Sequence, residues 1–222
     1  MMLPAPPAGD PSLGGAMLKA SDVSPRMFDN DLLDFFSRTP WLIVPALYVP
    51  LSLGVAGWAV RQGAGLLTTA VAFAFGVIVW TLTEYWLHRT AFHWVPNASW
   101  GEQFHFLVHG VHHKWHQDPY RLVMPPAVSL TLAVVFYGVF WGGAQLGALA
   151  GLSTGWHLGA YAGFVLGYCI YDCTHYMIHH WRPRGGRMKR LKTHHMDHHF
   201  HEPDLRFGVS TTIWDRVFGT AG

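Results

Sequence analysis

Five histidines fall within the twelve residues from 105 to 116, and their spacing suits the binding of a metal ion. On a helix that turns about 100° per residue, His105, His109, His112, His113 and His116 share one arc of about 100°. Neutral imidazole is a common protein ligand for zinc, iron, copper and nickel. A helix that carries this stripe would supply half of a metal site.

Three further histidine groups lie elsewhere in the chain. The last two use spacings of three or four residues, which place side chains on one face of a helix. The first pair is five residues apart, about 140° around a helix, which suits a helix that bends or ends between them. These groups are His88 and His93, then His175 and His179, then His195, His198 and His199.

The number and grouping of the histidines favour a metal site over ordinary core or surface histidines. The chain has 16 His against 13 Asp and Glu. A low-complexity tract would form a single run, whereas these residues form four groups at helical spacing. Ten or more imidazoles exceed the four ligands of a structural zinc ion. The sequence therefore predicts two metal ions with about five histidines each, which leaves coordination positions open.

The composition is that of a membrane protein. Half of the 222 residues are hydrophobic and only 13% are charged, and the charged residues leave long apolar runs between them. Residues 1–23 are expected to form a disordered tail, and residues 24–222 a single membrane-embedded domain. Transmembrane helices are predicted at about 41–60, 64–87, 125–148 and 156–178.

The distribution of basic residues predicts the orientation in the membrane. Of the 15 Lys and Arg, only Arg61 lies on the opposite side of the predicted bundle from the others, so both termini are expected in the cytoplasm. Fifteen of the 16 His lie on that same side, and His157 is the exception. We therefore expect an all-α integral membrane protein with four transmembrane helices and a cytoplasmic-side helical cap that holds the dimetal site. The net charge of +2 gives no reason to expect a nucleic-acid partner.

Three carboxylates are placed to support metal-bound histidines. A ligating His usually donates its other ring N–H to a carboxylate or a carbonyl. Glu84 is four residues before His88, Asp172 is three before His175, and Asp197 lies inside the last group. An acidic residue within a membrane helix is usually functional. The alternative is ordinary capping or surface charge, which suits Asp197 best.

A dinuclear histidine site at a membrane surface points to oxygen chemistry on a lipid, because an apolar C–H bond needs an oxidant that side chains cannot supply. The sequence resembles the fatty acid hydroxylase and sterol desaturase superfamily, and within it the fatty acid 2-hydroxylases. The resemblance covers about residues 24–220. Its motifs are Glu84–Arg89 with His93, His105–His113, Tyr120–Pro126, Tyr171–Tyr176 with His179, His195–His199, and Phe207–Thr220.

The resemblance implies both the ligands and the activity. The activity is that of an O2-dependent monooxygenase that hydroxylates the acyl chain of a fatty acid or lipid at carbon 2. It uses two metal ions, with iron expected in the active enzyme and zinc as an alternative occupant. The implied ligands are His88, His93, His109, His112, His113, His175, His179, His195, His198 and His199.

The remaining expectations concern electrons, location and rival functions. Many eukaryotic members of the family carry a cytochrome b5 domain, and no such motif precedes residue 24 here. An external redox carrier is therefore expected, either a cytochrome b5 or a ferredoxin with its reductase. A bacterial inner membrane is favoured over the endoplasmic reticulum. The alternatives are a sterol or carotenoid hydroxylase or desaturase of the same superfamily, and, in a different class, a metal transporter or another metal-binding membrane protein.

Overall fold

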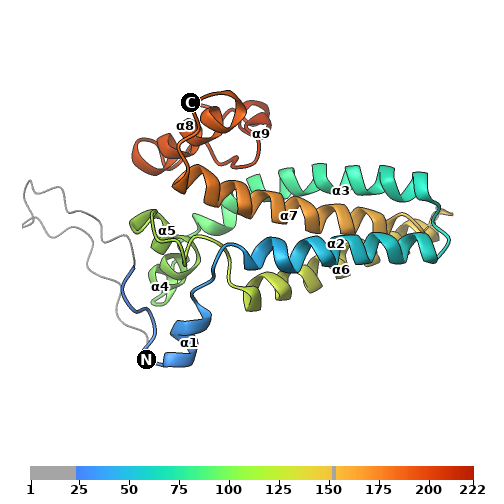
Figure 1. Ribbon diagram of the computed structural model, residues 1–222, viewed down its shortest axis with the longest axis horizontal. Helices are drawn as coiled ribbons and strands as arrows, with labels where there is room; N and C mark the ends of the chain where they lie inside the picture. Colours follow the sequence, from blue (N-terminus) through green and yellow to red (C-terminus); the bar gives the residue numbers. More distant parts are fainter. Residues whose placement is uncertain (1–23, 152–153) are drawn as a thin grey trace, which may run out of the picture.

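The described part of the chain is helical throughout. The computed structural model describes residues 24–151 and 154–222, and no strand occurs within them. The tail expected at residues 1–23 lies outside this part. Four long helices run side by side, and the short helices gather at one end of them (Figure 1). The expected all-α class is confirmed.

The long helices are α2 (Ile43–Arg61), α3 (Leu66–Trp86), α6 (Pro126–Leu149) and α7 (His157–His180). Three apolar segments are long enough to cross a membrane: α2, α6, and α3 together with the π-helix η1 (Leu87–Phe92). Their large apolar side chains are widely exposed, as on Leu53, Phe75 and Val134. Such contiguous exposed apolar surface requires a lipid environment. The chain is a membrane protein.

Helix α7 is the central helix of the bundle. It packs against α3, α2 and α6, and 16 of its 24 residues are buried. Because its side chains face protein on nearly all sides, α7 tolerates Tyr, Thr and Asp residues that a lipid-facing helix would avoid. Its last turns take His175, His179 and His180 to one end of the bundle.

Three glycines let α7 lie against α3. Gly159, Gly163 and Gly167 recur every four residues and so share one face of α7. A Cβ atom on Gly163 would lie 1.9 Å from the backbone oxygen of Phe73 on α3. Such spacing of small residues is a common device for close helix packing in membranes.

The remaining helices form a cap at the end of the bundle where α3 and α7 finish (Figure 1). They come from three parts of the sequence, which the long helices bring to the same end of the bundle. These helices are α1 (Asp31–Phe36), η1, α4 (Gly101–His105), the π-helix η2 (Phe106–Gly110), α5 (Val111–Lys114), α8 (Gly186–Phe200) and α9 (Ile213–Val217).

Ion pairs at a partly buried carboxylate attach α1 to the rest of the cap. The carboxylate of Asp34 accepts hydrogen bonds from Arg121 at 2.8 Å, Arg38 at 3.2 Å and the backbone N–H of Met27 at 2.8 Å. Burial opposes ionisation of Asp34, but these hydrogen bonds together hold its pKa well below the usual range. The N-terminal segment is thereby fixed beside the loop that follows α5.

Candidate metal centre

A π-helical turn brings the first pair of histidines together. At the spacing of an α-helix, His88 and His93 would point about 140° apart. In the structure, α3 continues into η1, and its wider turn of about 4.4 residues returns a side chain to the same face after five positions. The two ring centroids are 5.1 Å apart. The bend expected here is therefore a π-turn, a feature often found at functional sites.

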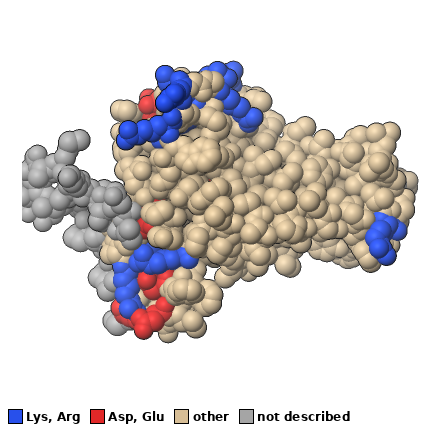
Figure 2. All heavy atoms as spheres, in the orientation of Figure 1, with Lys and Arg blue, Asp and Glu red and all other residues tan. Residues whose placement is uncertain are grey.

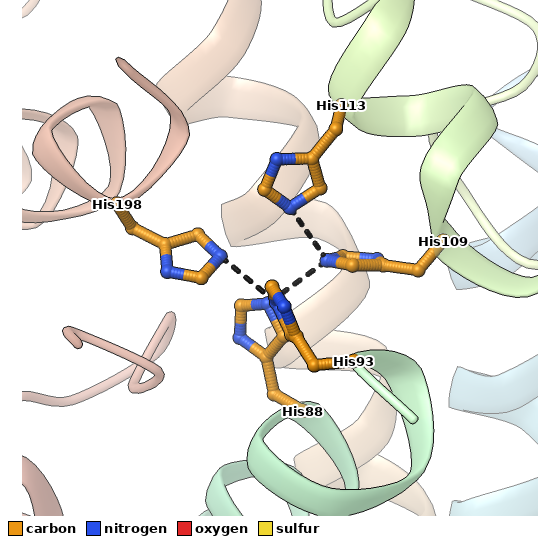
Figure 3. A group of neighbouring side chains, drawn as sticks. All are labelled: His88, His93, His109, His113 and His198. Atoms are coloured by element: carbon orange, nitrogen blue, oxygen red, sulfur yellow. Dashed lines mark hydrogen bonds between the residues drawn. The ribbon is translucent and has the colours of Figure 1, made fainter. Parts of the chain in front are cut away.

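The first histidine group consists of His88, His93, His109, His113 and His198. Figure 3 shows the five rings with nitrogens turned toward one another, on segments far apart in the sequence. The Nε2 atom of His109 lies 3.0 Å from Nε2 of His88 and 2.9 Å from Nε2 of His113. The Nε2 atoms of His93 and His198 are 3.2 Å apart.

The second histidine group consists of His112, His175, His179, His195 and His199. The Nε2 atom of His195 lies 2.9 Å from that of His175 and 3.0 Å from that of His179. It also lies 3.0 Å from Nε2 of His199, which in turn is 3.0 Å from Nε2 of His112. In each group, one nitrogen per ring lies within 4.8 Å of all the others.

The convergence of these nitrogens fits two metal ions. Nδ1 of His88 lies 2.6 Å from the carbonyl oxygen of Phe207 and donates its proton there, so a neutral ring presents a lone pair at Nε2. Nε2 of His195 faces three other Nε2 atoms, and a single proton cannot serve three contacts. Two nitrogens at right angles around an ion at about 2.1 Å are about 3.0 Å apart, as these contacts are. A central cation would remove the conflict between lone pairs.

The electrostatics of the cap also favour neutral imidazoles. Burial lowers the pKa of His113 to about 3, and the neighbouring His198 and His93 add to the effect. Burial lowers the pKa of His93 to about 4. It holds the pKa of His199 well below the ordinary value, with a contribution from His113. These rings are neutral at pH 7, so metal binding there does not first require the loss of a proton.

Backbone carbonyls, not carboxylates, accept the outer N–H groups of the first group. His88 donates to Phe207 as described, and Nδ1 of His198 lies 2.7 Å from the carbonyl oxygen of Leu205. Both carbonyls belong to the segment between α8 and α9. Side-chain types do not reveal these acceptors, because both are backbone groups.

The three carboxylates expected in this role have other partners in the described structure. Glu84 accepts from Trp80 and from the N–H and hydroxyl of Ser210. Asp172 accepts from Tyr168 and from the N–H of Met124. Glu84 on α3 and Asp172 on α7 are both buried. Asp197 is partly exposed and pairs with His201 on the surface.

The other six histidines lie outside both groups. Those near the site are His105, His116, His180, His194 and His201. His157 is the first residue of α7, 18 positions before His175 and so about 27 Å along the helix. The structure therefore separates it from both groups, at the far end of the bundle.

An apolar cavity lies beside the histidines. It is lined by residues of α3, η1, α6 and α7, including Leu87, Phe92, Phe136 and Phe164. Leu87 precedes His88, and Tyr171 in the same lining stacks on His175 at 5.8 Å. The lining of the cavity thus includes residues next to a histidine of each group.

One buried aspartate in the cap is not among the site residues predicted from the sequence. Asp215 of α9 is fully buried and lies 3.0 Å from the ring of His194. The signal was present in the ending Trp214-Asp215-Arg216-Val217-Phe218-Gly219-Thr220, but its spacing from the histidines gave it no role.

The sequence of this chain can be compared with known families. The sequence model of the family described as Fatty acid hydroxylase matches residues 73–220, a range that contains all ten histidines of the two groups. The chain belongs to the fatty acid hydroxylase family. The resemblance predicted from the histidine motifs is confirmed.

Individual relatives support this assignment. A dihydroceramide fatty acyl 2-hydroxylase of Arabidopsis thaliana is 37% identical over 88% of this chain and 79% of its own length. The fatty acid 2-hydroxylase of Homo sapiens is 36% identical over 88% of this chain, which spans 56% of that relative. A solved structure of full-length scs7p, with only the hydroxylase domain visible, matches with a TM-score of 0.79. That match has 37% identity and covers 89% of this chain and 72% of the other.

Proposed function

We propose that this chain is a fatty acid 2-hydroxylase that acts on the acyl chain of a fatty acid or a ceramide-type lipid. The observation that carries this function is the convergence of ten imidazoles into two groups beside an apolar cavity. The relatives named above as 2-hydroxylases support the position of hydroxylation. The overall reaction inserts one atom of O2 into the C–H bond at carbon 2 and releases the other as water. It consumes two electrons and two protons.

The two histidine groups would hold two metal ions, with iron as the working metal and zinc as an alternative occupant. Iron supplies the oxidising chemistry that no side chain can provide. The chain itself contributes neutral ring nitrogens, already turned toward each ion. It also contributes a fixed position for both ions beside the cavity.

The lining of the cavity has the chemistry that an alkyl chain requires. Its wall is dominated by aliphatic and aromatic side chains. Two of its polar groups are paired within the wall, since the Tyr48 hydroxyl donates to Ser129 at 2.6 Å. An alkyl chain placed there would leave these groups satisfied and would exclude water from the reacting carbon. The carboxyl or amide end of the substrate would lie toward the cap.

We propose that α7 crosses the membrane as a fourth helix, shielded by α2, α3 and α6, and that the cap faces the cytoplasm. Figure 2 shows Lys and Arg gathered at the cap end, and a single basic group at the opposite end, where α2 ends at Arg61. This asymmetry is what the positive-inside rule describes. Side chains of α1 are exposed at the cap end and suit contact with the membrane interface. These are Leu32, Leu33, Phe35 and Phe36.

Electrons would come from an acidic carrier such as a cytochrome b5 or a ferredoxin that docks on α8. Lys189 and Arg190 are exposed there, on the helix that supplies histidines to both groups. Arg187 is less available, because it donates to the carbonyl oxygen of Ser210 at 2.6 Å. Opposite charges on the carrier would steer it to this surface.

Product analysis tests the proposed function. The chain is expressed in a host that lacks 2-hydroxylated lipids, with iron and a reductant supplied under 18O2. Hydrolysed lipids should contain 2-hydroxy fatty acids that carry one 18O atom, as read by mass spectrometry. A hydroxylated or desaturated sterol or carotenoid, or the absence of any new oxidised lipid, would overturn the proposal.

A further inference from the structure

Asp215 accepts hydrogen bonds from the backbone of the segment between α8 and α9. Its Oδ1 accepts the N–H of Phe207 at 2.8 Å and the hydroxyl of Thr220 at 2.9 Å. Its Oδ2 accepts the N–H of Gly208 at 2.9 Å and lies 3.0 Å from Nε2 of His194. Four partners thus use both oxygens of a carboxylate that is 0% exposed.

The same segment carries the carbonyls that orient two rings of the first group. Phe207 accepts from Nδ1 of His88, and Leu205 accepts from Nδ1 of His198. Arg206, between these two acceptors, has a φ of +62°. A residue other than glycine keeps this left-handed conformation only where its surroundings fix it.

We propose that Asp215 is a positioning residue for the metal ion of the first histidine group. The N–H of Gly208 shares a peptide plane with the carbonyl of Phe207, so Asp215 sets the direction of the acceptor of His88 directly. The N–H of Arg206 shares a peptide plane with the carbonyl of Leu205 and donates to the carbonyl oxygen of Thr220 at 2.8 Å. Asp215 accepts from the hydroxyl of Thr220 and so holds the acceptor of His198 through that residue. Both rings then present Nε2 as a lone pair toward the ion. The inference rests on the proposed metal centre and adds to it a residue that contacts neither ion.

Space around Gly208 is consistent with a tightly held segment. A Cβ atom on Gly208 would lie 2.1 Å from the backbone oxygen of Thr211 and 2.6 Å from Oδ2 of Asp215. Only glycine allows the backbone to approach the carboxylate this closely. The segment therefore has little freedom to re-aim its carbonyls while Asp215 is intact.

The second histidine group has no comparable link to Asp215. Its rings are carried by α5, α7 and α8. None of the described hydrogen bonds of its Nδ1 atoms goes to the segment at 205–208. His194 does connect Asp215 to α8. Its neutral ring can change tautomer, however, so that Nε2 accepts a hydrogen bond instead of donating one. The N–H of a backbone amide has no such alternative.

The Asp215→Asn variant uses this difference. Its amide keeps one acceptor oxygen, and its NH2 group faces one of the two backbone N–H groups whichever way the amide is turned. One backbone donor of the segment therefore loses its acceptor. The metal content of the purified protein should fall from two ions per chain toward one. The ion of the first group should dissociate about 10–100-fold more readily, which is typical for the loss of an outer hydrogen-bond partner.

The control is Asp118→Asn. Asp118 is also a buried aspartate that accepts backbone N–H groups, those of Ser24 and Tyr120, but no described hydrogen bond joins it to the segment at 205–208 or to a ring of either group. This variant should keep two ions per chain. Thr220→Val is a milder second variant, because it removes only one of the four partners of Asp215. It should weaken metal retention in the same direction, by a smaller factor.

Combined variants locate the effect. With His88→Ala, which disables the first group, adding Asp215→Asn should change the metal content no further. With His175→Ala, which disables the second group, adding Asp215→Asn should remove most of the remaining ion. Equal loss from both groups, or full retention in Asp215→Asn and Thr220→Val, would overturn the positioning role while the metal centre stands. A wild-type protein that binds no metal would overturn both.

Discussion

The two histidine groups are built on different supports. In the first group, π-turns and the segment at 205–208 aim the rings, and backbone carbonyls fix the outer nitrogens of His88 and His198. In the second group, regular helix spacing aims most of the rings. His175 and His179 lie four residues apart on α7, and His195 and His199 lie four residues apart on α8. One site depends on a loop, and the other on helix packing.

The outer nitrogens show the same contrast. The Nδ1 atoms of His112, His179, His195 and His199 are buried and have no hydrogen-bond partner among the described residues. Their rings are held by contact with one another, as between His112 and His175, whose centroids are 4.5 Å apart. We infer that the two groups respond differently to the same perturbation. Loop changes should affect the first group, and helix changes should affect the second.

The largest effect is expected from loss of a ligand on α7. His175→Ala removes a ring nitrogen that lies 2.9 Å from Nε2 of His195. The second group should lose its ion, and 2-hydroxylation should fall by at least about 100-fold, since even outer-shell partners cost 10–100-fold. Metal content and the yield of 2-hydroxy acid measure the result.

A control for this prediction lies on the same helix. His157→Ala changes the histidine at the far end of α7, where its Nδ1 lies 2.7 Å from the Thr154 carbonyl oxygen. It should leave two ions per chain and full activity. Equal loss in both variants would refute a separate role for the cap end of α7.

The helical spacing of the second group is the part of the site that could be predicted from sequence. Intervals of four residues place His175 with His179, and His195 with His199, without any tertiary information. The choice among the sixteen histidines came from the family resemblance instead. The stripe on residues 105–116 alone would have included His105 and His116, which the structure leaves outside both groups.

The support of the first group could not be predicted. A π-turn depends on tertiary packing. From the sequence alone, the interval of five between His88 and His93 predicted a helix that bends or ends between them, and not a π-turn. The carbonyls of Leu205 and Phe207 cannot be recognised from the sequence, because every residue has a backbone carbonyl. In the bundle, too, some features could be predicted from the sequence and others were not. Apolar runs indicated helices near α2, α3, α6 and α7, but the four-residue repeat of Gly159, Gly163 and Gly167 was overlooked.

That repeat provides the second prediction. Gly163→Ala would place Cβ 1.9 Å from the Phe73 carbonyl, so α7 must move away from α3. We expect a loss of about 1–3 kcal/mol in unfolding free energy, as for other overpacked sites. Because α7 carries His175 and His179, the ion of the second group should be lost first. Unfolding in detergent and metal retention against a chelator measure both effects.

The matched substitution is Gly142→Ala on α6, where a Cβ atom meets nothing within 4 Å. It should not weaken metal binding, and it should stabilise α6 by up to about 1 kcal/mol. If Gly163→Ala released the ion of the first group before that of the second, the contrast between loop and helix supports would be wrong.

A smaller effect is expected at the far end of the loop. Ser210→Ala removes the hydroxyl that donates to Glu84 at 2.6 Å. The buried carboxylate loses one partner, which costs about 1–3 kcal/mol. The ion of the first group should be retained less well than in wild type, but better than in Asp215→Asn, because the carbonyls at 205 and 207 keep their nearest support.

Ser52→Ala controls for the loss of a buried hydroxyl. Ser52 is also fully buried, and donates to the carbonyl of Ala162 at 2.8 Å within the bundle. It should lower stability without a preferential loss of the first ion. The same metal profile in both variants would show that Ser210 does not act through the loop.

The smallest effect concerns electron delivery, where the two groups differ in their share of α8. The second group takes His195 and His199 from this helix, and the first takes only His198. Reversal of the exposed charges in Lys189→Glu with Arg190→Glu should slow reduction by an acidic carrier about 2–10-fold at low salt, because steering depends on long-range charge. Metal content should stay at two ions per chain, since neither side chain supports a ring.

Salt and position separate this effect from general damage. The difference from wild type should shrink as ionic strength rises, because salt screens exposed charges beyond about 10 Å at 0.1 M. The Arg61→Glu variant, changed at the opposite end of the bundle, should be reduced by the carrier at the wild-type rate. Stopped-flow reduction by a purified carrier gives the rates. If charge reversal on α8 changed nothing at any salt concentration, the carrier would dock elsewhere, and the proximity of the second group to α8 would have no bearing on electron entry.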